Sequence, residues 1–375
     1  MKITKCSPLI ILLFLMANVY SQDSKESKVL SALPINTWVK IHEPKKEDKV
    51  VFGRQAHGGS CFDSKRGQII LFGSNTHGRD WQNNPFCFDV EKLEWTKPYD
   101  EDPFDTYKVT EEGLPVAGKN GEHPWASHSF GAVMYDVSRD EMVVACWDEH
   151  LKPGRFTNVM KDLWPQVKLQ PTWLYSCEKK TWKAIPKGQS FFPNCAAYDS
   201  DRKVIIGYQS TGIFELSGEG ENREWSKVAE PVKELVGWHT NCAYDSKNKA
   251  LIVFGQQENK NDIGVYLVAT KQVKCMPTVG VRPPKDQHNP MEFHPELGKT
   301  VVLVDRTKQK DGATEDVTET WLYDLSADAW EQVKTANLPF GCGMNYNMEY
   351  DPKNKVMFLV VGGTATVWAI KISGQ

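Results

Sequence analysis

The sequence predicts an all-β fold assembled from repeated antiparallel units. Two recurring patterns carry this prediction. The first is an aromatic residue and Asp, followed by a polar turn and a run of β-branched residues; the second is a hairpin that ends in tryptophan. Each pattern is typical of two short strands joined by a tight turn, because Asp, Ser, Asn and Pro favour turns and β-branched residues favour strands. Helical periodicity is nearly absent.

The first pattern occurs six times. The copies are SCFDSKRGQIILFG at 60–73, VMYDVSRDEMVVAC at 133–146, AAYDSDRKVIIGY at 196–208, CAYDSKNKALIVFG at 242–255, MEFHPELGKTVVLVD at 291–305 and MEYDPKNKVMFLVVGG at 348–363. In the fifth copy, His294 takes the place of Asp. Regular self-similarity of this kind indicates a repeat architecture.

The second pattern follows most copies of the first. It reads FCFDVEKLEWTKP at 86–98, TWLYSCEKKTWKAI at 172–185, IFELSGEGENREWSKV at 213–228 and TWLYDLSADAWEQV at 320–333, with a weaker version, IGVYLVATKQVKC, at 263–275. Four short antiparallel strands per unit are typical of propeller blades. We therefore expect a single β-propeller with six repeats, and a seventh blade if residues 99–126 form a degenerate unit.

The last copy stops at Gln375 without an outer strand. The isolated segment TWVKIHEP at 37–44 could supply that strand, so that the N-terminal strand closes the last blade. Closure would remove the exposed sheet edges of an open array. We expect residues 151–170 to be an inserted loop with at most one short helix.

The N-terminus predicts export. Lys2 and Lys5 precede the apolar run 8–17, and Val19-Tyr20-Ser21 offers a cleavage site before Gln22. We therefore divide the chain into a signal peptide, 1–21, and a propeller catalytic domain, 22–375. No other stretch is long and apolar enough to span a bilayer, so we expect a secreted or periplasmic protein with no membrane contact.

The net charge limits the expected binding partners, and the cysteine pattern bears on whether disulfides are expected. A formal net charge of −3 gives no bulk attraction to a polyanion, so nucleic acid is not an expected partner. Eight cysteines remain after cleavage, without a CxxC pair, and most lie in apolar strand patterns. We expect them to be buried small hydrophobic residues rather than a disulfide framework, and we expect a monomer.

Polar residues recur at one end of the predicted hairpins. The candidates before the first strands are His57, His128, Asn194, His239, His288 and Asn345; those after second strands are Asn75, His77, Asp148 and His150. Entry to the first strand and exit from the second lie at the same end of a hairpin, so these residues should converge on one face. Imidazoles brought together there can carry proton chemistry near neutral pH.

The aromatic-Asp pattern and the closing tryptophan resemble those of Kelch-type propellers, although the Gly-Gly doublet of that group is mostly reduced to one glycine, as at Gly73 and Gly255. The pattern around His128 and His150 resembles the propeller-type ulvan lyases. That resemblance implies a secreted enzyme that cleaves an anionic, uronate-containing polysaccharide by β-elimination.

The resemblance also implies roles for individual residues. Ulvan lyases use two histidines about twenty residues apart, then a tyrosine and an arginine, and His128, His150, Tyr208 and Arg223 match that order. His128 and Tyr208 would then be the base and acid pair, in either order. His150 and Arg223 would hold the substrate carboxylate, with Arg155 as the competitor of Arg223. Asn75 and His77 would contact the neighbouring sugar.

These residue types suit the reaction. Elimination across C4–C5 of a uronic acid requires that the carboxylate be neutralised, that a base remove the C5 proton and that an acid protonate O4. The arginine fork can hold a carboxylate through two hydrogen bonds. The chemistry requires no cofactor.

Other features offer weaker candidates. Trp81, Trp125, Trp147 and Trp238 could stack on sugar rings, although core packing is the commoner role of such residues. His239, His288 and Cys342 start inner strands of three successive blades and could meet as a zinc site, structural rather than catalytic. The alternative function is a non-catalytic Kelch-like propeller that binds a glycan or a protein.

Overall fold

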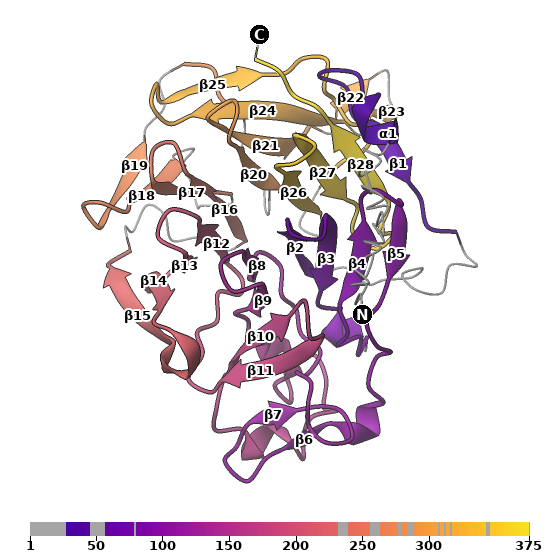
Figure 1. The fold of residues 1–375 in the computed structure, drawn as a ribbon, viewed down its shortest axis with the longest axis vertical. Helices are drawn as coiled ribbons and strands as arrows, with labels where there is room; N and C mark the ends of the chain where they lie inside the picture. The colour runs from indigo at the N-terminus through magenta and orange to yellow at the C-terminus, as the bar shows by residue number, and fades with distance from the viewer. Residues whose placement is uncertain are drawn as a thin grey trace, which may run out of the picture.

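The computed structural model describes residues 28–45, 57–78, 80–231, 239–255, 263–276, 280–283, 289–306, 308–310, 313–315, 317–342 and 346–374. The predicted signal peptide lies outside these residues. The regular secondary structure of the described chain is almost entirely β. Its main sheets are six antiparallel sheets of four strands each, arranged around a centre (Figure 1). Among the described helices, none has the length and apolar character needed to cross a membrane.

The first three sheets follow the chain in order, and each forms one blade. Blade one contains β2 (Gly59–Asp63), β3 (Gln68–Phe72), β4 (Phe86–Asp89) and β5 (Glu94–Thr96). Blade two contains β8 (Val133–Asp136), β9 (Glu141–Val144), β10 (Thr172–Ser176) and β11 (Thr181–Ile185). Blade three contains β12 (Cys195–Asp199), β13 (Val204–Gln209), β14 (Gly212–Ser217) and β15 (Glu224–Ala229).

The remaining blades complete the ring. Blade four contains β16 (Thr240–Asp245), β17 (Ala250–Gly255), β18 (Ile263–Leu267) and β19 (Gln272–Met276). Blade five contains β20 (Met291–His294), β21 (Lys299–Asp305), β24 (Thr318–Asp324) and β25 (Ala329–Gln332). Blade six contains β26 (Asn347–Asp351), β27 (Val356–Val360), β28 (Val367–Ile370) and β1 (Val39–His42).

The innermost strands show that the ring is complete with six blades. In turn, β2 contacts β8, β8 contacts β12, β12 contacts β16, β16 contacts β20, β20 contacts β26, and β26 returns to β2. The six predicted repeats are therefore confirmed as the six blades. The strands within residues 99–126 form only a small hairpin, β6 (Lys108–Val109) with β7 (Pro115–Val116), and no seventh blade.

The N-terminal strand closes blade six, as predicted. β1 pairs antiparallel with β28, with Val39 opposite Ala369 and Lys40 opposite Trp368. The neighbouring Trp38 is buried, and its indole nitrogen donates a hydrogen bond of 2.9 Å to Thr320 Oγ1 in blade five. The closing strand is thus joined to two blades.

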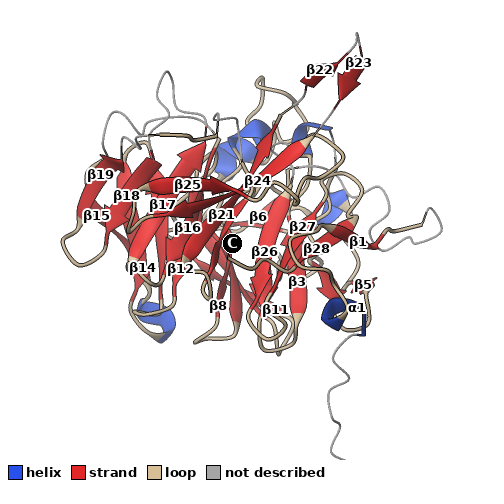
Figure 2. Ribbon diagram, turned by 90° about the horizontal axis from the view of Figure 1, so that it is seen from above, coloured by secondary structure: helices blue, strands red, loops and turns tan. Residues whose placement is uncertain are grey.

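Short elements outside the blades lie at the ring's margins. The small helix α1 (Lys28–Ser31) precedes β1. A hairpin of β22 (Lys308–Lys310) and β23 (Ala313–Glu315) stands out from blade five (Figure 2). The inserted loop 151–170 contains one 3₁₀ turn, η4 (Trp164–Gln166), which agrees with the expected single short helix.

The repeated Asp explains the turns between first and second strands. In blade one, Asp63 Oδ1 accepts hydrogen bonds from the backbone N–H groups of Lys65 and Arg66. Arg66 then pairs with Asp63 Oδ2 at 2.8 Å. Such side-chain caps satisfy turn N–H groups that would otherwise lack partners. Equivalent carboxylates in other blades are Asp136, Asp199, Asp245 and Asp351.

Apolar residues pack between neighbouring blades rather than in one central core. The centre instead contains a cavity of about 300 Å³ bordered by one inner strand from each blade. Residues on its wall include Ser60, Met134, Ala197, Cys242, Glu292 and Glu349. All eight cysteines in the described part of the chain are free thiols, and each is buried or half-buried, as expected.

The central cavity disfavours the ionised form of two acidic side chains, Glu292 and Glu349. Burial raises the pKa of Glu292 to about 7. Burial and the nearby charge of Glu292 raise the pKa of Glu349 to about 8, although Ser60 Oγ donates a hydrogen bond of 2.5 Å to it. Because the folded protein holds these protons more tightly than the unfolded chain, ionisation favours unfolding.

We therefore expect stability to fall as the pH rises from about 4.5, the ordinary pKa of Glu, to about 8. Replacing Glu349 with Gln should flatten this decline, because the amide cannot ionise. Measurements of Tm across this pH range test the prediction, with an expected change of roughly 2–4 °C per kcal/mol. The exposed Glu111→Gln serves as the control. An unchanged pH slope in Glu349→Gln would contradict the prediction.

Candidate functional site

Four histidines from blades one and two meet at one face of the propeller. His57 lies two residues before the start of β2, and His128 lies five residues before the start of β8. His77 lies in the 3₁₀ turn η1 (Thr76–Gly78) after β3, and His150 lies in the turn η3 (Glu149–Leu151) after β9. The convergence predicted from strand entries and exits is confirmed for these four residues, which we call the histidine cluster.

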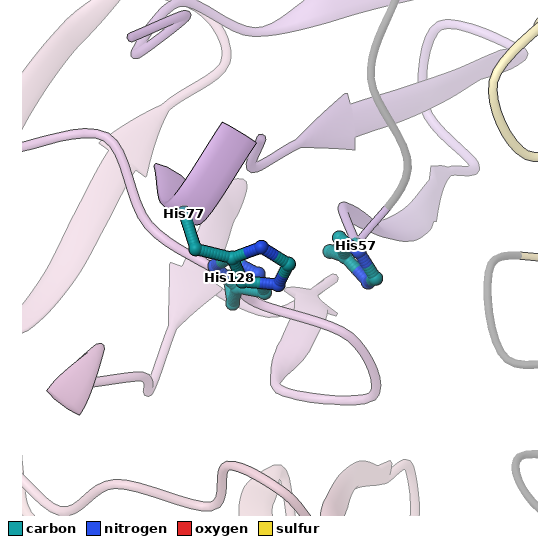
Figure 3. Close-up of side chains that lie close together, drawn as sticks. All are labelled: His57, His77 and His128. Atoms are coloured by element: carbon teal, nitrogen blue, oxygen red, sulfur yellow. The ribbon is translucent and has the colours of Figure 1, made fainter. Parts of the chain in front are cut away.

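His128 lies at the centre of the histidine cluster. Its ring is stacked with those of His57 and His77, with centroids 4.7 and 4.8 Å apart (Figure 3). The centroid of the His150 ring lies 4.4 Å from that of His128 and 5.4 Å from that of His77. Each ring is therefore close enough to influence the protonation of the others.

The buried Asp148 fixes two of these rings. Its Oδ2 atom lies 2.9 Å from His128 Nδ1, and its Oδ1 atom lies 2.9 Å from His150 Nδ1. It also accepts hydrogen bonds from the backbone N–H groups of both histidines. One carboxylate thus sets the position of both residues, and it makes Nδ1 the proton-bearing nitrogen of each ring.

Thr76 links blade one to this carboxylate. Its hydroxyl donates a hydrogen bond of 2.5 Å to Asp148 Oδ2 and lies 2.7 Å from His128 Nδ1. Burial opposes ionisation of Asp148, but the hydrogen bonds from His128, His150 and Thr76 outweigh it. The pKa of Asp148 is therefore lowered below its usual range. Asp148 carries its negative charge at neutral pH.

Two imidazoles of the histidine cluster, those of His57 and His77, resist protonation. Burial and, to a smaller extent, the neighbouring imidazoles together lower the pKa of His57 to about 3. Burial and proximity to His128 and His150 also lower the pKa of His77. Both rings are neutral near pH 7, and neutral imidazole nitrogens can accept protons or bind metal ions.

Access to the histidine cluster is uneven. His128 has only 1 % of its surface exposed, whereas His77 is exposed and His150 is partly so. Phe156 is 57 % exposed, and its ring centroid lies 5.1 Å from that of His77 and 5.0 Å from that of His150. The guanidinium of Arg155 lies 5.7 Å from the Phe156 ring centre. A ligand could therefore reach His77, His150, Phe156 and Arg155.

Tyr208 does not join the histidine cluster. It is fully buried in an apolar group that includes Ile206 and Ile213 of blade three and Tyr244 and Val253 of blade four. Burial raises the pKa of its hydroxyl well above the usual range. The expectation that Tyr208 acts as acid or base is wrong, because its side chain faces blade four and has no access to a substrate.

Arg223 lies at the opposite end of the blades. It is in the turn between β14 and β15, and it pairs with Glu141 at 2.7 Å and with Asp136 at 3.5 Å. Those two acids flank the turn between β8 and β9, whereas the histidine cluster lies at the other ends of these strands. The expectation that Arg223 holds a substrate carboxylate is wrong. Its competitor Arg155 lies beside the histidine cluster.

The remaining predicted residues have varied positions. Asn75 is half-buried and directly precedes Thr76. His239 precedes β16, with its ring centroid 6.3 Å from that of Phe130. Cys342 is buried in the apolar group between blades five and six. His288 and Asn345 lie outside the described residues, so the predicted zinc set remains a prediction.

Three of the four tryptophans proposed as sugar platforms lie among the described residues. Trp125 and Trp147 are buried in an apolar group that includes Tyr107 and Leu151, so the interpretation as sugar platforms is wrong for them. Trp81 is half-buried against Phe104, at a centroid distance of 4.7 Å. Trp238 lies outside the described residues.

Sequence reasoning did not assign roles to several residues of the site. Asp148 was seen only as a polar residue near His150, although an acid two residues before a histidine is a recognisable signal for a turn cap. Phe156 and Thr76 carried no signal, since each depends on contacts between loops of different blades. His57 was recognised only as one of a ring of polar residues.

Two sets of residues in and beside the histidine cluster have donor atoms near enough for a metal ion. The first is His57, His77 and His128; the second is His128, Asp148 and His150. Within each set the donor atoms lie within 4.8 Å of one another. In the second set, however, Asp148 already receives hydrogen bonds from both histidines and from Thr76.

No protein-family model and no curated protein matches this chain. Among solved structures, this chain is similar to TolB from Acinetobacter baumannii. The two chains are 8 % identical, the match covers 83 % of this chain and 78 % of TolB, and the TM-score is 0.40. Another similar structure is that of an auxiliary nutrient binding protein from Bacteroides thetaiotaomicron, with 11 % identity, coverage of 85 % and 69 %, and a TM-score of 0.44.

A third similar structure belongs to a nidogen/laminin complex, with 10 % identity, coverage of 76 % of this chain and 86 % of the other, and a TM-score of 0.42. Similarity at this level identifies no function. The class of this protein, a six-bladed β-propeller, follows from its own sheets and from their closed ring.

The position of Arg223 predicts a structural role. Replacing it with Ala would leave Asp136 and Glu141 without this cation, at a cost of about 1–3 kcal/mol in the free energy of unfolding. Chemical denaturation should show this loss, and the exposed Arg155→Ala should cause little change. Equal stabilities for the two variants would contradict the assignment.

Proposed function

We propose that this chain is an exported polysaccharide lyase that cleaves a uronate-containing anionic glycan, such as ulvan, by β-elimination at the histidine cluster. The supporting observation is the shared carboxylate of Asp148, which holds the Nδ1 atoms of His128 and His150 at 2.9 Å. A histidine whose Nδ1–H faces a carboxylate has Nε2 as its basic nitrogen. Export is inferred from the N-terminal pattern, and the glycan class from the resemblance to ulvan lyases.

His150 is the base in this proposal. His128 is almost completely buried, so a sugar ring cannot approach it, whereas His150 borders the surface. His128 is instead a positioning residue, because its ring packs against His150 and shares Asp148 with it. This assignment changes the expectation from the sequence, in which His128 took the proton-transfer role and His150 held the carboxylate.

One imidazole can carry out both proton transfers of the reaction. His150 Nε2 takes the C5 proton, the electron pair forms the C4=C5 double bond, and the C4–O4 bond breaks. The imidazolium formed on His150 then returns its proton to the leaving O4. The products are an unsaturated uronate and a new hydroxyl end, and no second acid is required in place of Tyr208.

The substrate carboxylate is assigned to Arg155. Its side chain is 38 % exposed, it follows His150 by five residues, and its guanidinium lies over Phe156 beside two rings of the histidine cluster. Arginine can neutralise the carboxylate with two parallel hydrogen bonds, which makes the C5 proton more acidic. The exposed Phe156 ring offers an apolar face for a neighbouring sugar.

The activity test is direct. The purified protein is incubated with ulvan and other uronate polymers, and the near-ultraviolet absorbance of the unsaturated product is followed. The wild-type chain should produce this absorbance, and His150→Ala should lower turnover by about a hundredfold, as expected on loss of general base catalysis.

His123 supplies a matched control for this test. It is also paired with an aspartate, Asp102, at 2.7 Å, but it stacks on Tyr99 outside the histidine cluster. His123→Ala should keep turnover within about twofold. No product from any uronate polymer would refute the lyase proposal, and retained binding of the polymer in that case would favour the non-catalytic alternative.

Arg155 and Arg223 give a second comparison. Arg155→Ala should lower kcat/KM by about 10- to 100-fold, since a charged hydrogen bond to the substrate is lost. Arg223→Ala should lower stability while the folded enzyme keeps its kcat/KM, measured well below its Tm. The opposite pattern would restore Arg223 to the active site.

A further inference from the structure

Three imidazoles of the histidine cluster present nitrogen atoms to one another. His57, His77 and His128 each offer one donor atom, and these three atoms lie within 4.8 Å of one another. They come from three separate loop positions, before β2, after β3 and before β8. Figure 3 shows the three side chains at this junction of blades one and two.

His128, the central member of this trio, is oriented by the contacts of its Nδ1 atom. His128 Nδ1 faces Asp148 Oδ2 and Thr76 Oγ1, so Nε2 lies on the opposite side of the ring. Nε2 is buried, and it has no hydrogen-bond partner among the residues that the structure describes. A carboxylate behind a histidine is the usual arrangement for a metal ligand, because it fixes the ring and strengthens the donor nitrogen.

We propose that His57, His77 and His128 bind a divalent transition-metal ion of the zinc class. Three imidazoles leave the fourth position of a tetrahedral ion open for water or an anionic oxygen. Calcium and magnesium fit poorly because they prefer oxygen ligands. Asp148 is committed to the histidines and acts behind His128 rather than on the metal.

The spacing of the donors is compatible with this ion. Imidazole nitrogens at about 2.0–2.1 Å from tetrahedral zinc are roughly 3.4 Å apart, so the 4.8 Å limit requires about 1.4 Å of closure at most. His77 is exposed and lies on a short turn, so rotation of its side chain can supply that closure. His128 stays fixed by Asp148 and Thr76.

The metal site is distinct from the base of the proposed reaction. His150 is not among the three ligands, and Asp148 uses separate oxygen atoms for His128 and His150. A metal ion would place a positive charge beside His150 and Phe156, on the surface where an acidic ligand could bind. The metal proposal does not depend on lyase activity.

Metal content tests the proposal. The full mature chain is stripped with a chelator, incubated with Zn²⁺, desalted and analysed by mass spectrometry for zinc per chain. His77→Ala should hold one zinc fewer than the wild type. His57→Asn should do the same, and asparagine tolerates the φ of 76° at this position. His123→Ala, outside the cluster, should keep the wild-type content.

Cobalt distinguishes this site from the zinc set predicted from His239, His288 and Cys342. Co²⁺ bound by imidazoles gives visible absorption without a thiolate charge-transfer band, whereas a site containing Cys342 gives that band. A visible signal lost in His77→Ala supports the proposal. Zinc content and cobalt spectra that are unchanged in both His77→Ala and His57→Asn would overturn it, and thermal unfolding confirms that the variants are folded.

Discussion

The pairing of β1 with β28 is the constraint on which the rest of the structure depends. It joins the N-terminal segment to blade six, and blade six in turn contacts blade one through β26 and β2. Without it, β28 would be an unpaired sheet edge. His57 lies two residues before β2, so the segment that leads into the strand in contact with blade six forms one wall of the histidine cluster. Ring closure therefore fixes both the central cavity and the loops at its face.

Asp148 is the electrostatic centre of the site. It is buried, yet hydrogen bonds from Thr76, His128 and His150 keep it ionised. A buried carboxylate without such donors would take up a proton. Thr76 belongs to blade one and the other partners to blade two, so the same contacts that stabilise the charge also join two blades. The positions of the catalytic candidates are thus a consequence of satisfying one buried charge.

The sequence was sufficient to predict the blades and the face on which the site lies. Asp63 and Asp136 mark equivalent turns, and His77 and His150 follow them at equal separations, so repeat geometry alone places both histidines together. Tyr208 and Arg223 could not be placed in this way. Tyr208 ends the correct strand, but its side chain faces blade four; Arg223 lies in a turn at the opposite end of its blade. A match in the order of residue types along the chain does not ensure that those residues lie at the same end of a blade or face the same cavity.

Crowding of four imidazoles around one carboxylate limits what the site can hold. Burial lowers the pKa values of His57 and His77, and the neighbouring rings lower them as well, because protonation of one ring disfavours protonation of the next. The neutral rings keep lone pairs available, and the buried charge of Asp148 favours a cation close by. A proton from a substrate and a metal ion both carry the positive charge that Asp148 favours, and they would bind at different nitrogen atoms. The base assigned to His150 and the metal assigned to the other three histidines are therefore compatible in one site.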